Sequence, residues 1–186
     1  MTYSKYIGII IIAALFSCGA SKTRVTYADI EALEALVKGR QFTIESDWAY
    51  PQTTGALQQI LSSGLLQGAS AGSINLIGNT NFLTISGDSI SAYLPYFGER
   101  QMQVNYGGGD STIEFNGIME NYLVEKNKDQ SYTISFEAKS HFENFNVYIR
   151  LFPSLKSNMV VNGASRFSIR YSGLAEKVAD AENTDE

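Results

Sequence analysis

The one histidine of the chain, His141, is the only side chain that offers an imidazole base. Catalysis by a serine or cysteine nucleophile needs such a base, held in place by a further side chain. His141 lies between two runs of alternating residues, which predicts an exposed hairpin loop instead. A tetrahedral metal site needs about four ligands, and one histidine with one cysteine cannot supply them. We therefore predict that the protein is not an enzyme and carries no metal or other cofactor.

Two carboxylates, Glu45 and Asp47, follow each other at a spacing of two in a predicted strand. This spacing predicts that they share one face, opposite the phase of Phe42, Ile44 and Trp48. Paired carboxylates act as general acid and base in glycosidases, where a cleft aims both at the substrate. Two acids on a wet strand face are more simply solvated, and nothing in the sequence indicates a cleft. A carboxylate-based hydrolase is therefore the least favoured function.

Aromatic residues form the strongest candidate for a ligand site. They fall at the ends of predicted strands, next to prolines and glycines that fix the shape of loops. Aromatic rings that carry a polar group suit surfaces that are apolar yet wet, such as the mouth of a barrel that grips a small apolar, sugar-like or peptide ligand. The alternative interpretation is that the same rings pack the core and rim of a barrel. The candidate ligand-binding residues are Trp48, Tyr50, Tyr93, Tyr96, Phe97 and Tyr106.

The sequence around Cys18, the one cysteine, is typical of an exported lipoprotein. Lys5 places a positive charge near the start of residues 1–17, and an apolar run over 7–16 follows. This run is shorter than the roughly 20 residues that cross a bilayer, and it fits the apolar core of a secretory signal. Leu15-Phe16-Ser17-Cys18 then resembles the lipobox of bacterial lipoproteins, and lipidation accounts for an unpaired cysteine. We predict a lipoprotein signal peptide over 1–17 and lipidation of Cys18.

Lipidation would anchor the protein to a membrane. Bacterial lipoproteins carry several acyl chains on this cysteine, and stable anchoring takes more than one chain. Gly19 is not the aspartate that retains some lipoproteins at the inner membrane, and no acidic run follows it. We therefore predict a cell-envelope protein that is lipid-anchored, on the outer membrane and facing the periplasm. Residues 18–26 are small and polar and are predicted to be a tether.

The net charge of the 186-residue chain is −5, and much of it lies at the C-terminal end. Residues 176–186 contain five acids and one lysine, which gives −4 for this segment alone. The rest of the chain is close to neutral and shows no basic patch, which argues against binding to nucleic acid. We interpret residues 174–186 as an acidic, solvated tail.

The elements that must position these side chains are mostly strands. Residues 27–38 are predicted to form a helix, because Thr26 and Asp29 form a capping box and apolar residues recur at helical spacing. A short helix is predicted within the glycine-rich segment 53–72. Elsewhere apolar and polar residues alternate with a period of two, which predicts antiparallel strands with one dry face. Strands are predicted around 42–48, 81–86, 90–94, 113–115, 132–138, 144–151, 159–161 and 166–172.

Eight to ten such strands, joined by short turns, predict an all-β, mainly antiparallel domain over 27–173 with an N-terminal helix. A meander that closes into a lipocalin-like β-barrel solves the problem of exposed sheet edges, and a β-sandwich is the alternative.

Five segments resemble the DUF4251 family, a group of bacterial envelope proteins that often carry lipoprotein signals. The resemblance extends over about 36–173 and implies a compact all-β domain and an envelope location, with no catalytic residues to transfer. The segment over 87–100 is the most specific. The five segments are Asp47-Trp48-Ala49-Tyr50-Pro51, Asn79-Thr80-Asn81-Phe82, residues 87–100, Ile113-Glu114-Phe115-Asn116-Gly117 and Ile169-Arg170-Tyr171-Ser172-Gly173.

Two functions remain open from the sequence. The first is a lipid-anchored, non-catalytic binding or accessory module. The second is a structural or protein-docking component of the envelope, for which the predicted wet-face residues Arg166, Ser168 and Arg170 and the pair Tyr148 and Arg150 offer a surface. An open interior would favour the first as a small-ligand carrier. An interior filled by residues such as Phe136, Ile149 and Phe167 would instead direct attention to the surface.

Overall fold

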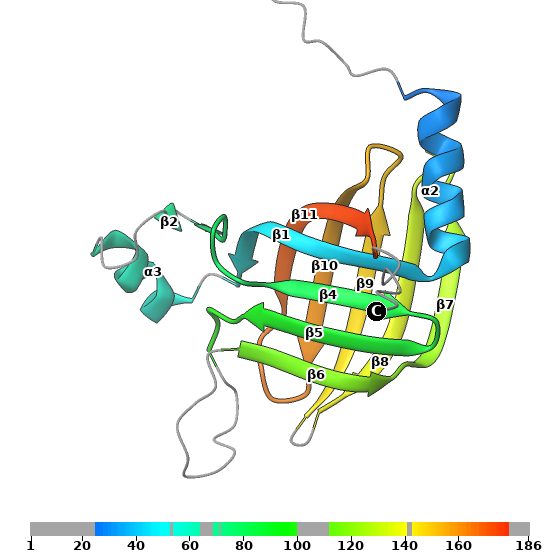
Figure 1. The fold of residues 1–186 in the computed structure, drawn as a ribbon. Coiled ribbons are helices and arrows are strands. Elements are labelled where there is room, and N and C mark those ends of the chain that lie inside the picture. The colour runs from blue at the N-terminus through cyan, green and yellow to red at the C-terminus, as the bar shows by residue number, and fades with distance from the viewer. Residues whose placement is uncertain are drawn as a thin grey trace, which may run out of the picture.

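The computed structural model describes residues 25–52, 54–63, 69–70, 72–99, 112–140 and 143–178. The predictions for Cys18, Tyr106 and His141 concern residues outside these ranges. The described residues form one helix, then a sheet that curves into a barrel (Figure 1).

Helix α2 (Tyr27–Gly39) begins with the predicted capping box. The hydroxyl of Thr26 accepts a hydrogen bond from the Asp29 N–H at 3.2 Å, and the Thr26 N–H donates to the Asp29 carboxylate at 2.8 Å. These bonds satisfy N–H groups that the first helical turn leaves without a partner. The helix ends where Arg40 adopts a left-handed conformation with φ 47°. The predicted helix is therefore confirmed to within a residue.

Eleven strands and a second short helix follow α2. The predicted helix within 53–72 is confirmed as α3 (Gly55–Ser62). The strands are β1 (Gln41–Pro51), β2 (Ala69–Ser70), β3 (Ser73–Asn75), β4 (Phe82–Ser86), β5 (Ser89–Pro95), β6 (Thr112–Ile118), β7 (Glu120–Lys126), β8 (Tyr132–Lys139), β9 (Asn144–Leu151), β10 (Lys156–Gly163) and β11 (Ile169–Lys177).

The strands pair antiparallel in the order β6-β5-β4-β1-β11-β10-β9-β8-β7. Two meanders, β4 to β6 and β7 to β11, are thus joined through β1, which lies between β4 and β11. The two ends of this order are consecutive in the chain, because β6 leads through the buried Met119 directly into β7. One bent stretch therefore brings the sheet nearly back onto itself, and the predicted barrel is confirmed (Figure 1).

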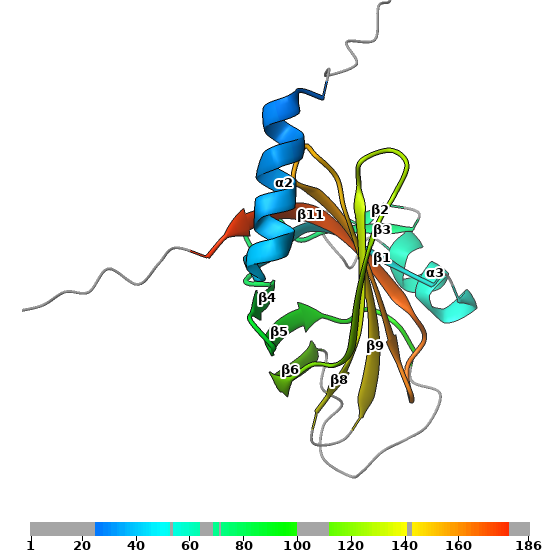
Figure 2. The same cartoon turned by 90° about the vertical axis from the view of Figure 1, so that its right-hand side faces the viewer.

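The interior of the barrel is filled by apolar side chains from β1, β4 to β6 and β8 to β11. Phe136 and Ile149, two residues expected to pack there, are 3% and 1% exposed. Leu33 and Val37 of α2 are also buried, and the helix stands across one end of the barrel (Figure 2). The largest fully buried side chains include Phe42, Ile44, Leu76, Leu83, Ile85, Leu94, Ile113, Ile134, Phe145 and Tyr171.

A β-bulge interrupts β1 at Asp47, since Ser46 pairs with Gly173 and Trp48 with Ser172. Beyond the bulge, Ala49 takes the buried phase and Trp48 is half-buried in the opposite one. The prediction that Trp48 shares the phase of Phe42 and Ile44 is therefore wrong. The extra residue at Asp47 shifts the alternation by one.

The side chain of Asn81 holds this bulge in place. Its amide oxygen accepts from the Ser46 N–H at 2.8 Å, and its amide nitrogen donates to the Ser46 carbonyl at 2.9 Å. On the other side the backbone approaches Gly173 so closely that a Cβ there would collide with the carbonyl of Glu45. A buried amide and a glycine, both from segments that carry the family resemblance, thus shape the bulge.

The C-terminal strand differs from the sequence prediction at both ends. Phe167 precedes β11 and is half-buried, so the alternation that fills the barrel begins at Ile169. The strand continues to Lys177, past the start of the segment interpreted as an acidic tail.

Candidate functional site

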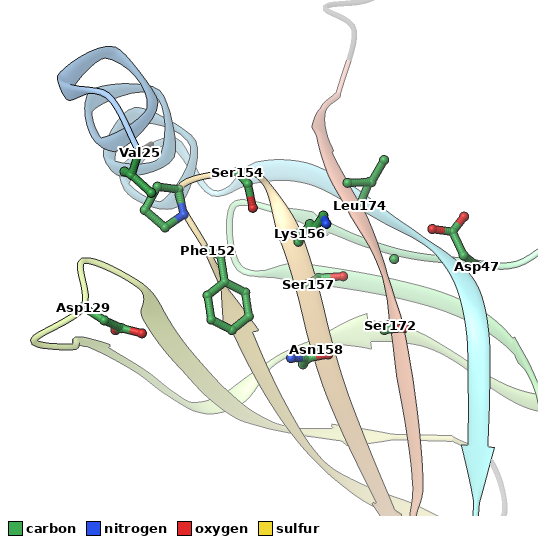
Figure 3. Close-up of a pocket in the computed structure, with 12 residues that line it drawn as sticks. Val25, Asp47, Asp129, Phe152, Ser154, Lys156, Ser157, Asn158, Ser172 and Leu174 are labelled. Atoms are coloured by element: carbon green, nitrogen blue, oxygen red, sulfur yellow. The ribbon is translucent and has the colours of Figure 1, made fainter. Parts of the chain in front are cut away.

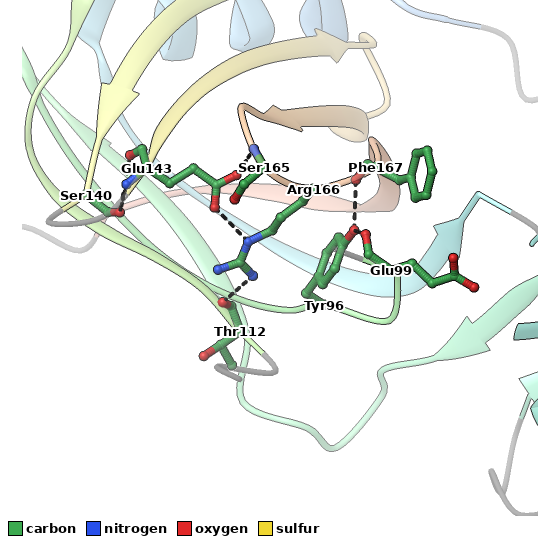
Figure 4. A network of polar contacts seen from close by, with 8 residues as sticks. All are labelled: Tyr96, Glu99, Thr112, Ser140, Glu143, Ser165, Arg166 and Phe167. Carbon is green, nitrogen blue, oxygen red and sulfur yellow. Dashed lines mark hydrogen bonds and ion pairs between the residues drawn. The ribbon is translucent and has the colours of Figure 1, made fainter. Parts of the chain in front are cut away.

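An ion pair between Glu143 and Arg166 lies buried at one end of the barrel. Arg166 Nε donates to Glu143 Oε2 at 2.8 Å, and the two side chains are 8% and 4% exposed. The second carboxylate oxygen accepts from the Ser165 N–H at 2.8 Å, and Arg166 Nη1 donates to the Thr112 carbonyl at 2.8 Å (Figure 4). The prediction of Arg166 as a wet-face residue is therefore wrong. A loop carboxylate, which strand alternation does not reveal, draws the guanidinium inward.

Tyr96 packs directly against this ion pair. Its hydroxyl bonds to the carbonyl groups of Glu99 at 2.9 Å and Phe167 at 3.1 Å, and its ring centroid lies 5.1 Å from the Arg166 guanidinium carbon. Beside it the hydroxyl of Tyr171 donates to the Pro95 carbonyl at 2.8 Å, and burial raises the pKa of Tyr171. The Glu143 carboxylate, two of the Arg166 nitrogens and the hydroxyls of Tyr96 and Tyr171 therefore all have protein partners. The barrel end is thus a closed, satisfied network that supports the fold.

The outer wall of the barrel carries a groove between the start of α2 and strands β10, β11 and β1. Its volume is about 590 Å³, within the usual size of small-molecule sites. The bulge in β1, the β9–β10 turn and the start of α2 contribute to its wall (Figure 3). The lining residues are Val25, Asp47, Asp129, Phe152, Pro153, Ser154, Lys156, Ser157, Asn158, Ser172, Gly173 and Leu174.

Polar groups in this groove are left without protein partners. Asp47, Lys156 and Asn158 make no side-chain hydrogen bond or ion pair within the described part of the chain. Asn158 lies opposite Ser172 on the neighbouring strand, and Lys156 lies opposite Leu174. One acid, one cation and one amide therefore face a surface whose remainder is largely apolar. Such a mixture fixes the orientation of a small amphiphilic molecule.

A second acid at the groove, Asp129, is already engaged. Its carboxylate accepts from the Ser131 hydroxyl at 2.6 Å and forms an ion pair with Arg150 at 2.8 Å. The hydrogen bond from Ser131 is the main cause that lowers the pKa of Asp129. Asp47 is therefore the acid of the groove with unused acceptors.

The structure separates the sequence-predicted ligand residues. Trp48 and Tyr50 lie on β1 beside the groove, where Trp48 pairs with Ser172 and the Tyr50 hydroxyl lies 3.2 Å from the Ser172 hydroxyl. Tyr93 lies on the outer face of β5, in another hollow. Tyr96 is buried at the barrel end, Phe97 is half-buried against the core, and Tyr106 lies outside the described residues.

Sequence reasoning missed Lys156, Asn158 and Leu174. Lys156 and Asn158 alternate with the buried Ser157 and Met159, which marks them as outward-facing. Leu174 alternates in the same way with the buried Gly173 and Ala175 on β11. What makes them a site is the bulge at β1 and the adjoining turn, which come from segments far apart in the chain.

The chain belongs to the family described as Domain of unknown function (DUF4251), whose model matches residues 26–175. A crystal structure of a DUF4251 family protein from Bacteroides eggerthii DSM 20697 has a similar fold, with a TM-score of 0.56 and 12% sequence identity. The similarity covers 81% of this chain and 88% of that chain. No curated protein matches the chain.

The segments that carry the family resemblance meet at two places. Asp47, Asn81 and Gly173 meet at the bulge beside the groove. Tyr96 and Tyr171 meet at the barrel end. Family membership therefore agrees with the fold, and the description of the family names no activity.

Two further observations concern membrane-spanning helices and groups of metal ligands. Of the helices within the described ranges, none has both the length and the apolar character to span a membrane. The described residues also contain no group of three or more His, Cys, Asp and Glu side chains suited to a metal ion.

Proposed function

We propose that the protein is a non-catalytic binding module of the cell envelope, anchored by lipid on Cys18, whose ligand lies in the groove on the outer wall. The observation that carries this proposal is the presence of three unpartnered polar side chains, Asp47, Lys156 and Asn158, in a largely apolar hollow of about 590 Å³. The groove lies on the outer wall, whereas the described inward side chains of the barrel are buried. Binding therefore occurs outside the barrel rather than within it.

The chemistry of the groove suits a small amphiphile. Lys156 and Asn158 donate to an anionic or carbonyl group, and Asp47 accepts from an amine or hydroxyl. Phe152, Pro153 and Leu174 contact the apolar part of the same molecule. A charge-assisted hydrogen bond from Lys156 contributes most of the polar recognition.

The position of Val25 relates this groove to the anchor. Val25 lines the groove and lies near the end of the predicted tether, seven positions along the chain from a lipidated Cys18. A fully extended tether of that length reaches about 25 Å. In this proposal the groove stays close to the membrane, on the periplasmic side of the outer membrane.

The test is to extract the full chain from membranes and identify by mass spectrometry the small molecules that remain bound. We expect one amphiphile at near-stoichiometric amount, which Lys156→Glu releases. Lys139→Glu is the matched control. It reverses the charge of the last residue of β8, which does not line the groove, and so leaves the groove intact. Retention of the same molecule by Lys156→Glu, or no bound molecule in the unaltered protein, would contradict the proposal.

Protein docking is the second candidate function. Exposed Tyr148 on β9, at 47%, and exposed Arg170 on β11 lie on either side of Val160, with which both pair across the outer wall. Tyrosine and arginine are enriched at the centres of protein interfaces. Cross-linking in intact membranes checks this candidate: one protein partner that is lost on Tyr148→Ala supports docking, and recovery of the full chain alone argues against it.

A further inference from the structure

A second hollow lies on a different part of the outer wall, over β4, β5 and β6. Its volume is about 430 Å³. The antiparallel register aligns two rows of outward side chains across these strands. The first row is Phe82, Tyr93 and Glu114, and the second is Thr84, Ser91 and Asn116.

The first row provides a flat aromatic surface. The rings of Phe82 and Tyr93 are stacked, with centroids 6.5 Å apart and planes inclined by 24°. Tyr93 is 37% exposed. The two ring planes are nearly parallel, and the exposed ring of Tyr93 offers an apolar surface against which the C–H face of a pyranose ring can lie.

The surroundings of this platform are rich in neutral hydrogen-bonding groups. Thr80, Ser91 and Asn116 line the hollow, and their side chains have no hydrogen-bond partner within the described part of the chain. Together they supply hydroxyl and amide groups that both donate and accept. Such groups match the hydroxyl groups of a sugar, which also donate and accept.

The charge of the hollow further restricts the class of ligand that it can bind. Glu114 is the single charged side chain among the described residues that line it, and no cation accompanies it. An anionic ligand would meet a carboxylate with no compensating charge. The groove near Lys156 differs in this respect, so the two hollows select different ligands.

We infer that the hollow over β4, β5 and β6 binds a neutral oligosaccharide. One sugar ring lies on Tyr93 and Phe82, and its hydroxyl groups bond to Asn116, Ser91 and the Glu114 carboxylate. Binding involves no covalent step. This site is separate from the groove, so the inference does not depend on the function proposed above.

The test applies the full chain to an array of neutral and acidic glycans, in a polyoxyethylene detergent that carries no sugar headgroup. We expect retention by neutral glycans and none by acidic ones. Tyr93→Ala should lower the apparent affinity about tenfold, because it removes the stacking surface. Tyr93→Phe should retain binding, since it keeps the ring.

Asn116→Ala tests the site with little risk to the fold, because this side chain is exposed and makes no hydrogen bond within the described part of the chain. Its removal should weaken binding about three- to tenfold. Tyr148→Ala removes an exposed ring from the opposite wall and should change nothing. Lys156→Glu should also leave glycan binding intact, which separates this inference from the groove. The inference is overturned if no neutral glycan is retained, if acidic glycans bind equally well, or if Tyr93→Ala and Asn116→Ala bind like the unaltered chain.

Discussion

Two places in the molecule combine a carboxylate with a cation and use them in opposite ways. At the barrel end Glu143 and Arg166 are buried and bonded to each other and to backbone groups. In the outer groove Asp47 and Lys156 line an open hollow and have no side-chain partner among the residues that the structure describes. The same residue types therefore hold the fold together in one place and remain available to a ligand in the other.

The difference follows from desolvation. A buried charge is costly unless an opposite charge and hydrogen bonds compensate for lost water, so the barrel end tolerates Arg166 only with Glu143. An exposed charge keeps its water and needs no partner. Burial and pairing thus distinguish a structural charge from one that is free to bind, and mutations can test this distinction.

The largest effect is expected at Arg166. Arg166→Met should leave the Glu143 carboxylate buried without its cation and lower the free energy of unfolding by about 3–5 kcal/mol. Urea denaturation measures this loss. The double variant Glu143→Gln with Arg166→Met should recover part of it, because the amide keeps an acceptor for the Ser165 N–H. A loss below about 1 kcal/mol in the single variant would show that the pair is not structurally important.

Asn81, which fixes the bulge beside the groove, should rank second. Asn81→Leu leaves the buried N–H and carbonyl of Ser46 without these bonds, and we expect a loss of about 2–3 kcal/mol in unfolding free energy. Asn79→Ala is the control, because Asn79 is exposed and takes part through its backbone carbonyl. Equal stability of the two variants would mean that the bulge does not need the Asn81 amide.

Lys156 should matter for binding and hardly at all for stability. Lys156→Met removes an exposed cation that has no partner, so the unfolding free energy should change by no more than about 0.5 kcal/mol. The same change should release the amphiphile that the proposed function expects to co-purify with the chain. A clearly destabilised Lys156→Met variant would contradict the contrast between the groove and the barrel end.

The smallest effect is expected at Asp129, the engaged acid of the groove. Its pKa in the folded chain lies below the ordinary value of 3.8, chiefly because Ser131 donates to the carboxylate. A lowered folded-state pKa stabilises the fold above the ordinary pKa, and this contribution disappears as the pH falls through the folded-state value. The urea midpoint should therefore fall more steeply below pH 3.8 in the unaltered chain than in Asp129→Asn. Parallel curves would mean that the hydrogen bond does not contribute.

The strands and helices were largely predictable because their signals are local. Thr26 and Asp29 are three residues apart, and the buried faces of β8 and β9 appear directly as alternation. The bulge was not predictable, because it depends on an Asn81 amide that lies 35 positions from Ser46. Arg166 was misplaced for a similar reason, since its partner Glu143 belongs to a different loop.

The groove and the positions of the aromatic residues could likewise not be predicted from local sequence signals. Sequence reasoning selected rings by type, and the structure distributes the described ones over the groove margin, the second hollow and the barrel end. A site assembled from α2, a turn and three strands has no contiguous signature. Outward alternation in β10 identifies Lys156 and Asn158 as exposed, but only their neighbours make them a pocket.

The pairing of β1 with β11 also sets the order in which the chain can fold. Phe42 pairs with Lys177, so the first long strand acquires its second neighbour only when the last strand is present. Contacts between such distant positions form slowly, because a long loop must close first. A chain that emerges from its N-terminus, whether from a ribosome or through a membrane pore, must therefore wait for its final residues before the barrel can assemble. Until β11 is available, β1 lacks one of its long neighbours and the barrel stays open.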